Sequence, residues 1–209
     1  MFKKHSKLVI FTSLFTILPI LIGLLLWTNL PAKMAIHFST NGADGWSSKT
    51  FVVFVVPFIL LATHILSIFL TSLDPKCKDL KTIPLYTTFL CVPIISNITM
   101  IFLYLNALNI TFNTLILSNA LAGLVLIILS FIMPQLSPNR VIGIKLPWTI
   151  NNETVWYKTH KLASILWTVG GIILLINIFI KNIIITSIIF IILILVPVIY
   201  SYIISKNYN

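Results

Sequence analysis

Six apolar stretches, each about 20 residues long, alternate with short polar segments along the chain. A helix of about 20 residues spans the roughly 30 Å hydrocarbon core of a bilayer, so each stretch predicts a membrane-spanning helix. We therefore expect an all-α fold, a polytopic membrane helical bundle with six transmembrane helices. The expected spans are residues 8–30, 51–73, 83–105, 114–133, 162–180 and 183–204.

The composition leaves little room for a soluble domain. Hydrophobic residues make up 58% of the chain and charged residues only 9%, whereas soluble domains carry about 25% charged residues. Lys3, Lys4 and Lys7 precede the first span as they would in a signal peptide. The apolar core of that span is longer than the usual 7–15 residues and no small-residue cleavage pair follows it, so we interpret it as a retained anchor.

A formal net charge of +10 raises the possibility of nucleic-acid binding, but the position of the charges argues against it. In the six-span topology, eleven of the basic residues fall before span one, after spans two and four, and in the tail, whereas three fall on the other side. The positive-inside rule then places both termini of this multi-pass protein in the cytoplasm. The expected contacts of these charges are membrane lipids, with no direct nucleic-acid partner.

The polar segment between spans one and two contains strong turn signals. Pro31 ends the first helix, and the Asn41-Gly42 and Asp44-Gly45 pairs tolerate the backbone conformations of tight turns. We expect a short extended segment, a reversal and a return to the membrane surface, all on the outer side.

Two polar side chains of this outer segment, His37 and Asp44, permit two interpretations. They form either an acid/base pair or half a metal site, or else a loop-closing hydrogen bond or a contact with a partner. Their spacing matches no metal signature, and the chain has only four acidic residues. It also lacks GxSxG, HExxH and phosphate-binding glycine motifs. We expect no metal, no cofactor and no enzymatic activity.

His64 is the only histidine, acidic or basic side chain deep inside a predicted span. Such residues often serve as proton relays or ligand contacts. The alternative is a hydrogen bond to Thr63, Ser67 or another helix. A small membrane transporter or membrane-embedded enzyme that uses this histidine with His37 or His160 is therefore an alternative function.

The inner segment 138–161 is long and detailed for a connector. Its first half is irregular, and Asn151 or Asn152 followed by Glu153 predicts the start of a short amphipathic helix leading into span five. Trp156 and His160 lie four residues apart and share one face of that helix. The segment is either an anchor at the lipid headgroups or a docking surface for a soluble partner.

Two motifs carry a resemblance that extends over essentially the whole chain. The outer segment reads LP-x4-IHF-x3-GADGW-x2-K, and the inner one reads NR-x2-GIKLPWT-x6-W-x-KTHK. Both resemble the SdpI family, immunity proteins against the sporulation-delaying-type toxin of Gram-positive bacteria. This chain departs from the family pattern at Ala35, where relatives often have proline, and at Lys145, where they usually have arginine.

The resemblance implies protection of the producer cell from a secreted peptide toxin, with possible toxin sensing and recruitment of a cytosolic transcriptional repressor. It divides the chain into an N-terminal membrane region, 1–105, of the family's uncharacterised type, and an SdpI-like region, 106–209. A scaffold that only recruits a regulator is a third alternative. Candidate toxin contacts are His37, Phe38, Asp44, Trp46, Lys49 and His64, and candidate partner-docking residues are Asn139, Arg140, Lys145, Trp148, Trp156, Lys158 and His160.

Overall fold

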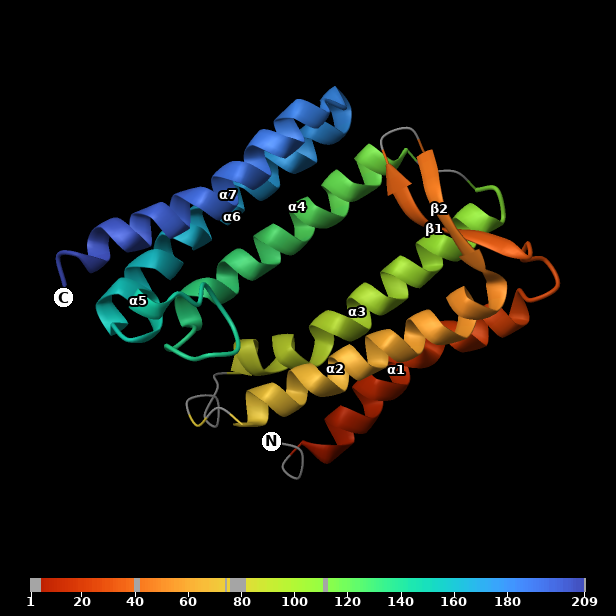
Figure 1. The fold of residues 1–209 in the computed structure, drawn as a ribbon, viewed down its shortest axis with the longest axis horizontal. Coiled ribbons are helices and arrows are strands. Elements are labelled where there is room, and N and C mark those ends of the chain that lie inside the picture. Colours follow the sequence, from red (N-terminus) through yellow and green to blue (C-terminus); the bar gives the residue numbers. More distant parts are fainter. Residues whose placement is uncertain (1–4, 40–41, 74, 76–81, 111–112, 209) are drawn as a thin grey trace. The chain divides into compact units, whose positions relative to one another are not determined.

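The structure is a computed structural model that describes residues 5–39, 42–73, 75, 82–110 and 113–208 (Figure 1). Six of its helices are long and apolar enough to cross a membrane, so the predicted all-α polytopic bundle is confirmed. These spans are α1 (Ser6–Leu25), η1 (Phe51–Val55) continued by α2 (Val56–Leu73), α3 (Thr82–Ala107), α4 (Thr114–Ile132), α6 (Glu153–Ile180) and α7 (Ile183–Ser205). The remaining elements are strands β1 (Lys33–Ser39) and β2 (Gly42–Ser48) and the short helices η3 (Met133–Gln135) and α5 (Pro147–Ile150).

The chain forms two compact units, each with three of the long helices. The first comprises residues 1–73 and 85–114 and contains α1, α2, α3 and the two strands. The second comprises residues 74–84 and 115–209 and contains α4 to α7. In the first unit the two strands lie at the end where α1 and α3 finish (Figure 1).

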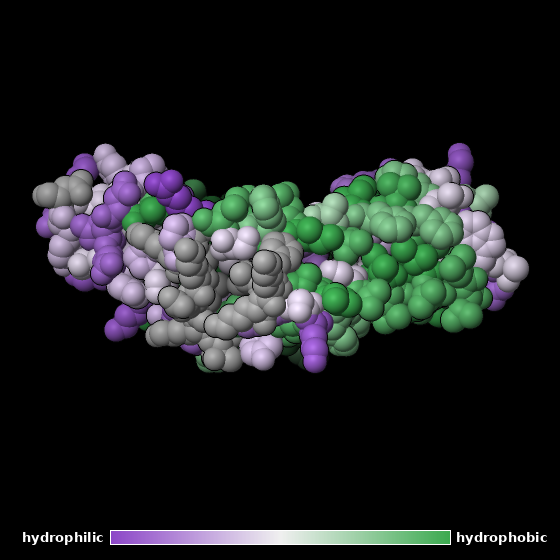
Figure 2. All heavy atoms as spheres, turned by 90° about the horizontal axis from the view of Figure 1, so that it is seen from below, coloured by the Kyte–Doolittle hydropathy of each residue, from purple (hydrophilic) through white to green (hydrophobic). Residues whose placement is uncertain are grey.

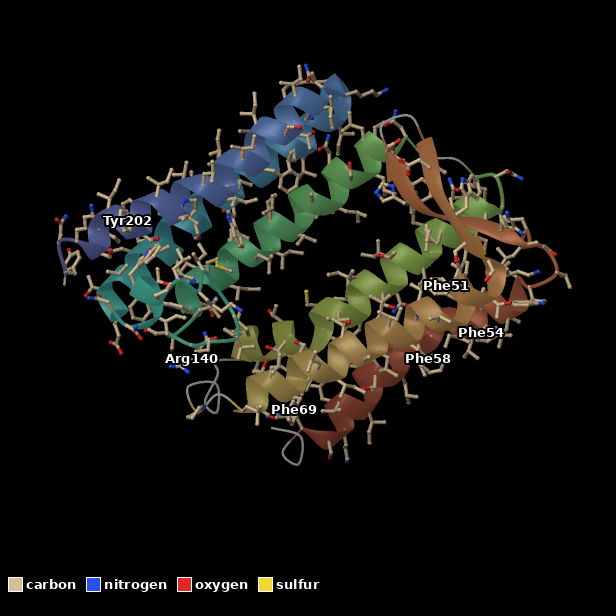
Figure 3. The ribbon with its side chains drawn as sticks, viewed as in Figure 1. Phe51, Phe54, Phe58, Phe69, Arg140 and Tyr202 are labelled. Atoms are coloured by element: carbon tan, nitrogen blue, oxygen red, sulfur yellow. The ribbon has the colours of Figure 1, made fainter. Side chains whose placement is uncertain are left out.

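The outward faces of the helices are apolar, as lipid contact requires. Leu25 and Phe179 are 85% and 86% exposed. Phe58 and Phe69, labelled in Figure 3, are also exposed on α2. Figure 2 shows apolar side chains over the helical stretches of one face, with hydrophilic side chains gathered toward the ends. Helices with such faces satisfy their backbone hydrogen bonds internally and leave hydrocarbon-compatible surface outside.

In the first unit, side chains of α3 bond to carbonyl groups of α1, one of which a proline leaves unpaired. Pro19 has no N–H, so the carbonyl of Phe15 lacks its helical donor. The Asn97 side chain donates to that oxygen at 2.8 Å. The Tyr104 hydroxyl donates to the Pro19 carbonyl at 2.9 Å, where Gly23 leaves space for the ring. These interhelical hydrogen bonds fix α3 against α1.

The role of Asn97 predicts a coupled pair of substitutions. Asn97→Leu should lower the free energy of unfolding by about 1 kcal/mol, the size of an interhelical hydrogen bond in a bilayer. In a Pro19→Ala background the cost should fall, because the restored N–H pairs with the Phe15 carbonyl. Reversible unfolding of the wild type, the two single variants and the double variant measures the coupling. If Asn97→Leu lowers the free energy of unfolding equally with and without Pro19→Ala, this role of Asn97 is refuted.

The second unit contains a tight antiparallel pair, α6 and α7. Lys181 ends α6 in the left-handed conformation at φ 57°, and the Asn182 side chain accepts from the N–H of Ile184 at 2.8 Å to begin α7. A buried chain of side-chain hydrogen bonds then ties three helices together. Asn177 on α6 donates to Thr186 on α7 at 2.9 Å, and Thr186 donates to Asn119 on α4 at 2.9 Å.

Candidate functional site

The outer segment folds into a β-hairpin, formed by β1 and β2. The strands pair antiparallel, with Lys33 opposite Ser48 and Ser39 opposite Gly42, and the register shifts around His37. The predicted extended segment and its return are therefore confirmed. Of the two predicted turn signals, Asn41 of the Asn41-Gly42 pair lies outside the described residues, and the Asp44-Gly45 pair lies within β2 and forms no turn. Gly42, at φ +108°, has a positive φ that glycine adopts without the steric cost of a side chain.

Lys49 ties the base of this hairpin to the end of α1. Its ammonium group donates to the carbonyl oxygens of Trp27 at 2.8 Å and Leu30 at 3.1 Å and lies 4.5 Å from the centre of the Trp27 ring. A cation is favoured there, because the carbonyl groups that follow a helix point away from it with partial negative charge. Lys49, which was predicted as a toxin contact, is half-buried and holds the hairpin in position.

His37 and Asp44 face each other across the two strands. His37 Nδ1 donates to Asp44 Oδ1, and both side chains are exposed. Gly45 makes this possible, since a Cβ there would lie 2.8 Å from the Cβ of His37. Among the described residues, no group of three histidine, cysteine or acidic side chains is arranged to hold a metal ion. The pair therefore closes the hairpin through a side-chain hydrogen bond.

This pair makes the hairpin sensitive to acid. The hydrogen bond from His37 holds the pKa of Asp44 below its ordinary value of 3.8. The pairing therefore stabilises the hairpin fully above that pH, and the stabilisation is lost as the pH falls through the lowered pKa of the folded state. The difference in tryptophan fluorescence between the wild type and Trp46→Phe should change in this acid range. Asp44→Asn should abolish the change, and persistence of the transition in that variant would contradict the assignment.

The two aromatic candidates of the hairpin have different surroundings. Phe38 is half-buried and packs edge-on against Phe102 of α3, with ring centres 4.9 Å apart. Trp46 is 59% exposed. Phe38 therefore holds the hairpin against α3, and Trp46 presents apolar surface at the outside of the hairpin.

His64 lies fully buried on α2 and bonds to α1. Thr12 donates its hydroxyl hydrogen to the carbonyl of Leu8, so His64 Nε2 donates to the Thr12 oxygen, at 2.9 Å. Its Nδ1 has no partner among the described residues. The expected alternative, a hydrogen bond to another helix, is confirmed. The hydrogen bonds described for His37 and His160 go to other groups, so these contacts do not assemble the three histidines into one site.

The start of span five differs from the prediction. The expected short amphipathic helix is not a separate element, because α6 runs without a break from Glu153 to Ile180. The Asn152 side chain accepts from the N–H of Val155 at 3.1 Å and begins the helix. No glycine or proline interrupts residues 153–169, so nothing stops the helix before the membrane.

Trp156 and His160 lie inside the folded inner segment. Both side chains are fully buried, and their rings stack with centres 4.0 Å apart. Trp156 Nε1 donates to the carbonyl of Leu136 at 2.8 Å. His160 Nδ1 donates to the Trp156 carbonyl at 2.8 Å, and Nε2 accepts from the N–H of Ile144 at 3.0 Å. The histidine holds the segment in its neutral form, because a protonated Nε2 has no lone pair for Ile144.

Gly143 and Asn139 shape the backbone around this pair. Gly143 has φ +112°, and a Cβ there would lie 2.4 Å from His160 Nε2. The buried Asn139 side chain accepts from the N–H groups of Val141 at 2.8 Å and Ile142 at 2.7 Å. Three predicted docking residues, Asn139, Trp156 and His160, therefore support the segment from within.

The other docking candidates lie at the surface of this segment or close to it. Arg140 and Lys145 are exposed in the irregular part, where Figure 3 labels Arg140. Lys145 donates to the Val141 carbonyl at 2.9 Å. Lys158 is exposed on the first turns of α6. These three cations place positive charge at the surface of the segment.

The end of the chain contributes residues that sequence analysis did not single out. Trp148 on α5 donates to the Ser201 hydroxyl at 3.0 Å and packs edge-on against Tyr202, labelled in Figure 3. Lys158 donates to the Tyr208 hydroxyl and lies 4.4 Å from the centre of that ring. In the sequence, only the position of Tyr202 and Tyr208 near the end of the last apolar stretch could have indicated that they contact the inner segment.

The fold and the two ordered segments define a multi-pass α-helical membrane protein with a distinct polar structure in each half of the chain. A model of the SdpI/YfhL protein family matches residues 135–201, and a model described as Domain of unknown function (DUF1648) matches residues 14–61. The chain is 28% identical over 193 residues to Immunity protein SdpI of Bacillus subtilis (strain 168), which covers 91% of this chain and 90% of that protein. The comparison with solved structures finds no match. Together these matches support membership of the SdpI family, and the chain is a multi-pass protein of the bacterial plasma membrane.

Proposed function

We propose that this chain is a membrane immunity protein that protects the cell producing it from a secreted peptide toxin. The likeness to Immunity protein SdpI carries the proposal, because it extends over nine-tenths of both chains. It therefore includes the hairpin of the first half and the folded inner segment of the second. The protein acts by binding, without a cofactor or a chemical step.

The hairpin is the proposed site of contact with the toxin. The positive-inside rule places it outside the cell. Trp46 supplies exposed apolar surface there, while Phe38, Lys49 and the His37–Asp44 pair hold the strands in place. The N-terminal region 1–105 would thus face the toxin.

The SdpI-like region 106–209 is proposed to carry the signal to the cytosol. Arg140, Lys145 and Lys158 form the surface for a cytosolic repressor, and the Trp156–His160 core keeps that surface in one conformation. Toxin alters this surface only if it binds two states of the protein with different affinity.

One observation favours the alternative function of a transporter that uses an intramembrane histidine. The Nδ1 atom of His64 is buried without a partner among the described residues, and polar groups of that kind in a membrane often mark a functional site. His64→Leu separates the two functions. Unchanged protection at normal protein levels favours immunity without a histidine relay, and lost protection favours a role for His64.

The proposal is tested by expressing the chain in a toxin-sensitive host and challenging the cells with a sporulation-delaying-type peptide. We expect survival to rise at least tenfold over cells with the empty vector. A variant that lacks residues 32–48 and reaches the membrane in equal amount should give no protection. Equal killing of cells with the wild-type protein and with the empty vector would refute immunity toward this toxin.

A further inference from the structure

A hollow of about 480 Å³ lies between the hairpin and the end of α3. We propose that it binds a short apolar segment of the secreted peptide, with a carboxylate of that peptide at Lys33; this rests on the proposed immunity function. The volume falls within the range of about 300–1,000 Å³ that is typical of ligand pockets. All the residues that line it belong to the first compact unit.

Small side chains create this hollow. Ala35, Gly42 and Ala43 line it from the strands, and Ala107 lines it from α3. None of these residues extends beyond a Cβ, so the hairpin and the helix can pack without filling the space between them. Larger side chains at these positions would close it, which makes the hollow directly testable.

The walls of the hollow suit an apolar side chain. Phe38 and Trp46 contribute aromatic rings, and the fully buried Met34 belongs to the packed core behind them. Trp46 is 59% exposed, so bound apolar groups would cover surface that now faces outward. Burial of aromatic and aliphatic groups is the main source of affinity in such sites.

The polar groups that line the hollow determine which chemical groups a ligand must carry. Among the described residues that line it, Lys33 carries the only formal charge. The occupant therefore presents an anionic group rather than a cationic one. Asn106 and Asn109 also line the hollow, and an amide side chain can both donate to and accept from a peptide backbone. This combination fits a peptide better than an acyl chain, which has no use for amide groups.

The test measures binding of a synthetic sporulation-delaying-type peptide to the full-length protein in lipid nanodiscs. Ala43→Trp fills the hollow from the strand and Ala107→Leu fills it from the helix. We expect each to weaken binding at least tenfold. Ile36→Trp is the matched control, because Ile36 is exposed on the same hairpin and does not line the hollow. It should bind like the wild type.

The carboxylate contact has its own test. Lys33→Gln should weaken binding about tenfold. If amidation of the peptide C-terminus causes the same loss, the contact is the terminal carboxylate, and if amidation has no effect, it is a side-chain carboxylate. Unchanged binding in Lys33→Gln would overturn the proposal.

The outcome is separable from that of the immunity test. Protection by the wild type together with full binding in both filled variants would overturn the hollow as the site and leave immunity standing. Loss of a co-purified phospholipid in the filled variants, without loss of peptide binding, would assign the hollow to lipid and also overturn the proposal. Absence of protection by the wild type would instead refute the underlying function.

Discussion

Gly143→Ala should disrupt the inner segment and lower the free energy of unfolding by about 3 kcal/mol. The estimate combines about 1–2 kcal/mol for a side chain at positive φ with about 1 kcal/mol for each hydrogen bond lost around His160. The new methyl group would lie 2.4 Å from His160 Nε2. The imidazole cannot move aside, because it is buried and stacked on Trp156.

Trypsin reports this change directly, because Arg140 and Lys145 are exposed cleavage sites within the segment. Cleavage there should become at least tenfold faster in Gly143→Ala. Gly42→Ala is the matched control, since it has a similar φ of +108° and nothing within 4 Å of the added Cβ. It should show backbone strain alone. Equal stability of the two variants, with equal cleavage, would contradict the packing described for His160.

Lys49→Met should abolish protection while leaving the protein in the membrane. The substitution removes two hydrogen bonds to carbonyl groups beyond α1 and the contact with Trp27. Hydrogen bonds from a charged group contribute about 1.5–3 kcal/mol each, so the base of the hairpin would be free to move. Survival under toxin challenge and protease access to the hairpin measure the two consequences.

Lys181→Met is the control for this substitution. It removes the same charge from the same predicted side of the membrane, but Lys181 is an exposed residue in the turn between α6 and α7. It should protect like the wild type. A Lys49→Met protein that still protects fully would show that the fixed position of the hairpin is not needed.

Hydrophobic length was enough to predict the membrane helices. Each apolar stretch must satisfy its backbone within itself, so the spans follow from local sequence. The extended segments of the hairpin were predictable for a similar reason, since Pro31 and the Asn41-Gly42 pair act locally. Asp44-Gly45 was also interpreted as a turn signal, but the pair lies inside β2, where its backbone follows the pairing with β1. The prediction missed that α6 begins at Glu153 and continues into the membrane span without a break. The change from polar to apolar residues at position 162 marks the point where the helix enters the membrane, and not the end of one helix and the start of another.

The contacts that organise the two candidate sites depend on residues far apart in the chain. The spacing of Trp156 and His160 shows that they share a face, but their burial depends on Leu136 and Ile144 folding over them. In the same way, Pro19 shows that a carbonyl of α1 is unpaired, yet nothing local identifies Asn97 as its donor. The structural role of Lys49 was missed for the same reason. Its bonds to the carbonyl groups beyond α1 form only when the hairpin is folded, so the sequence did not indicate them.

The hairpin should face the medium, and the inner segment should face the cytosol. Single cysteines at Ala32 and Asn151 test it, because both residues are exposed and neither side chain is described in a hydrogen bond. Cys77 and Cys91 are first replaced by serine and alanine. In intact cells, a membrane-impermeant maleimide should label Ala32→Cys fully and Asn151→Cys only after the cells are opened. Labelling of Asn151→Cys in intact cells, with Ala32→Cys protected, would contradict the account.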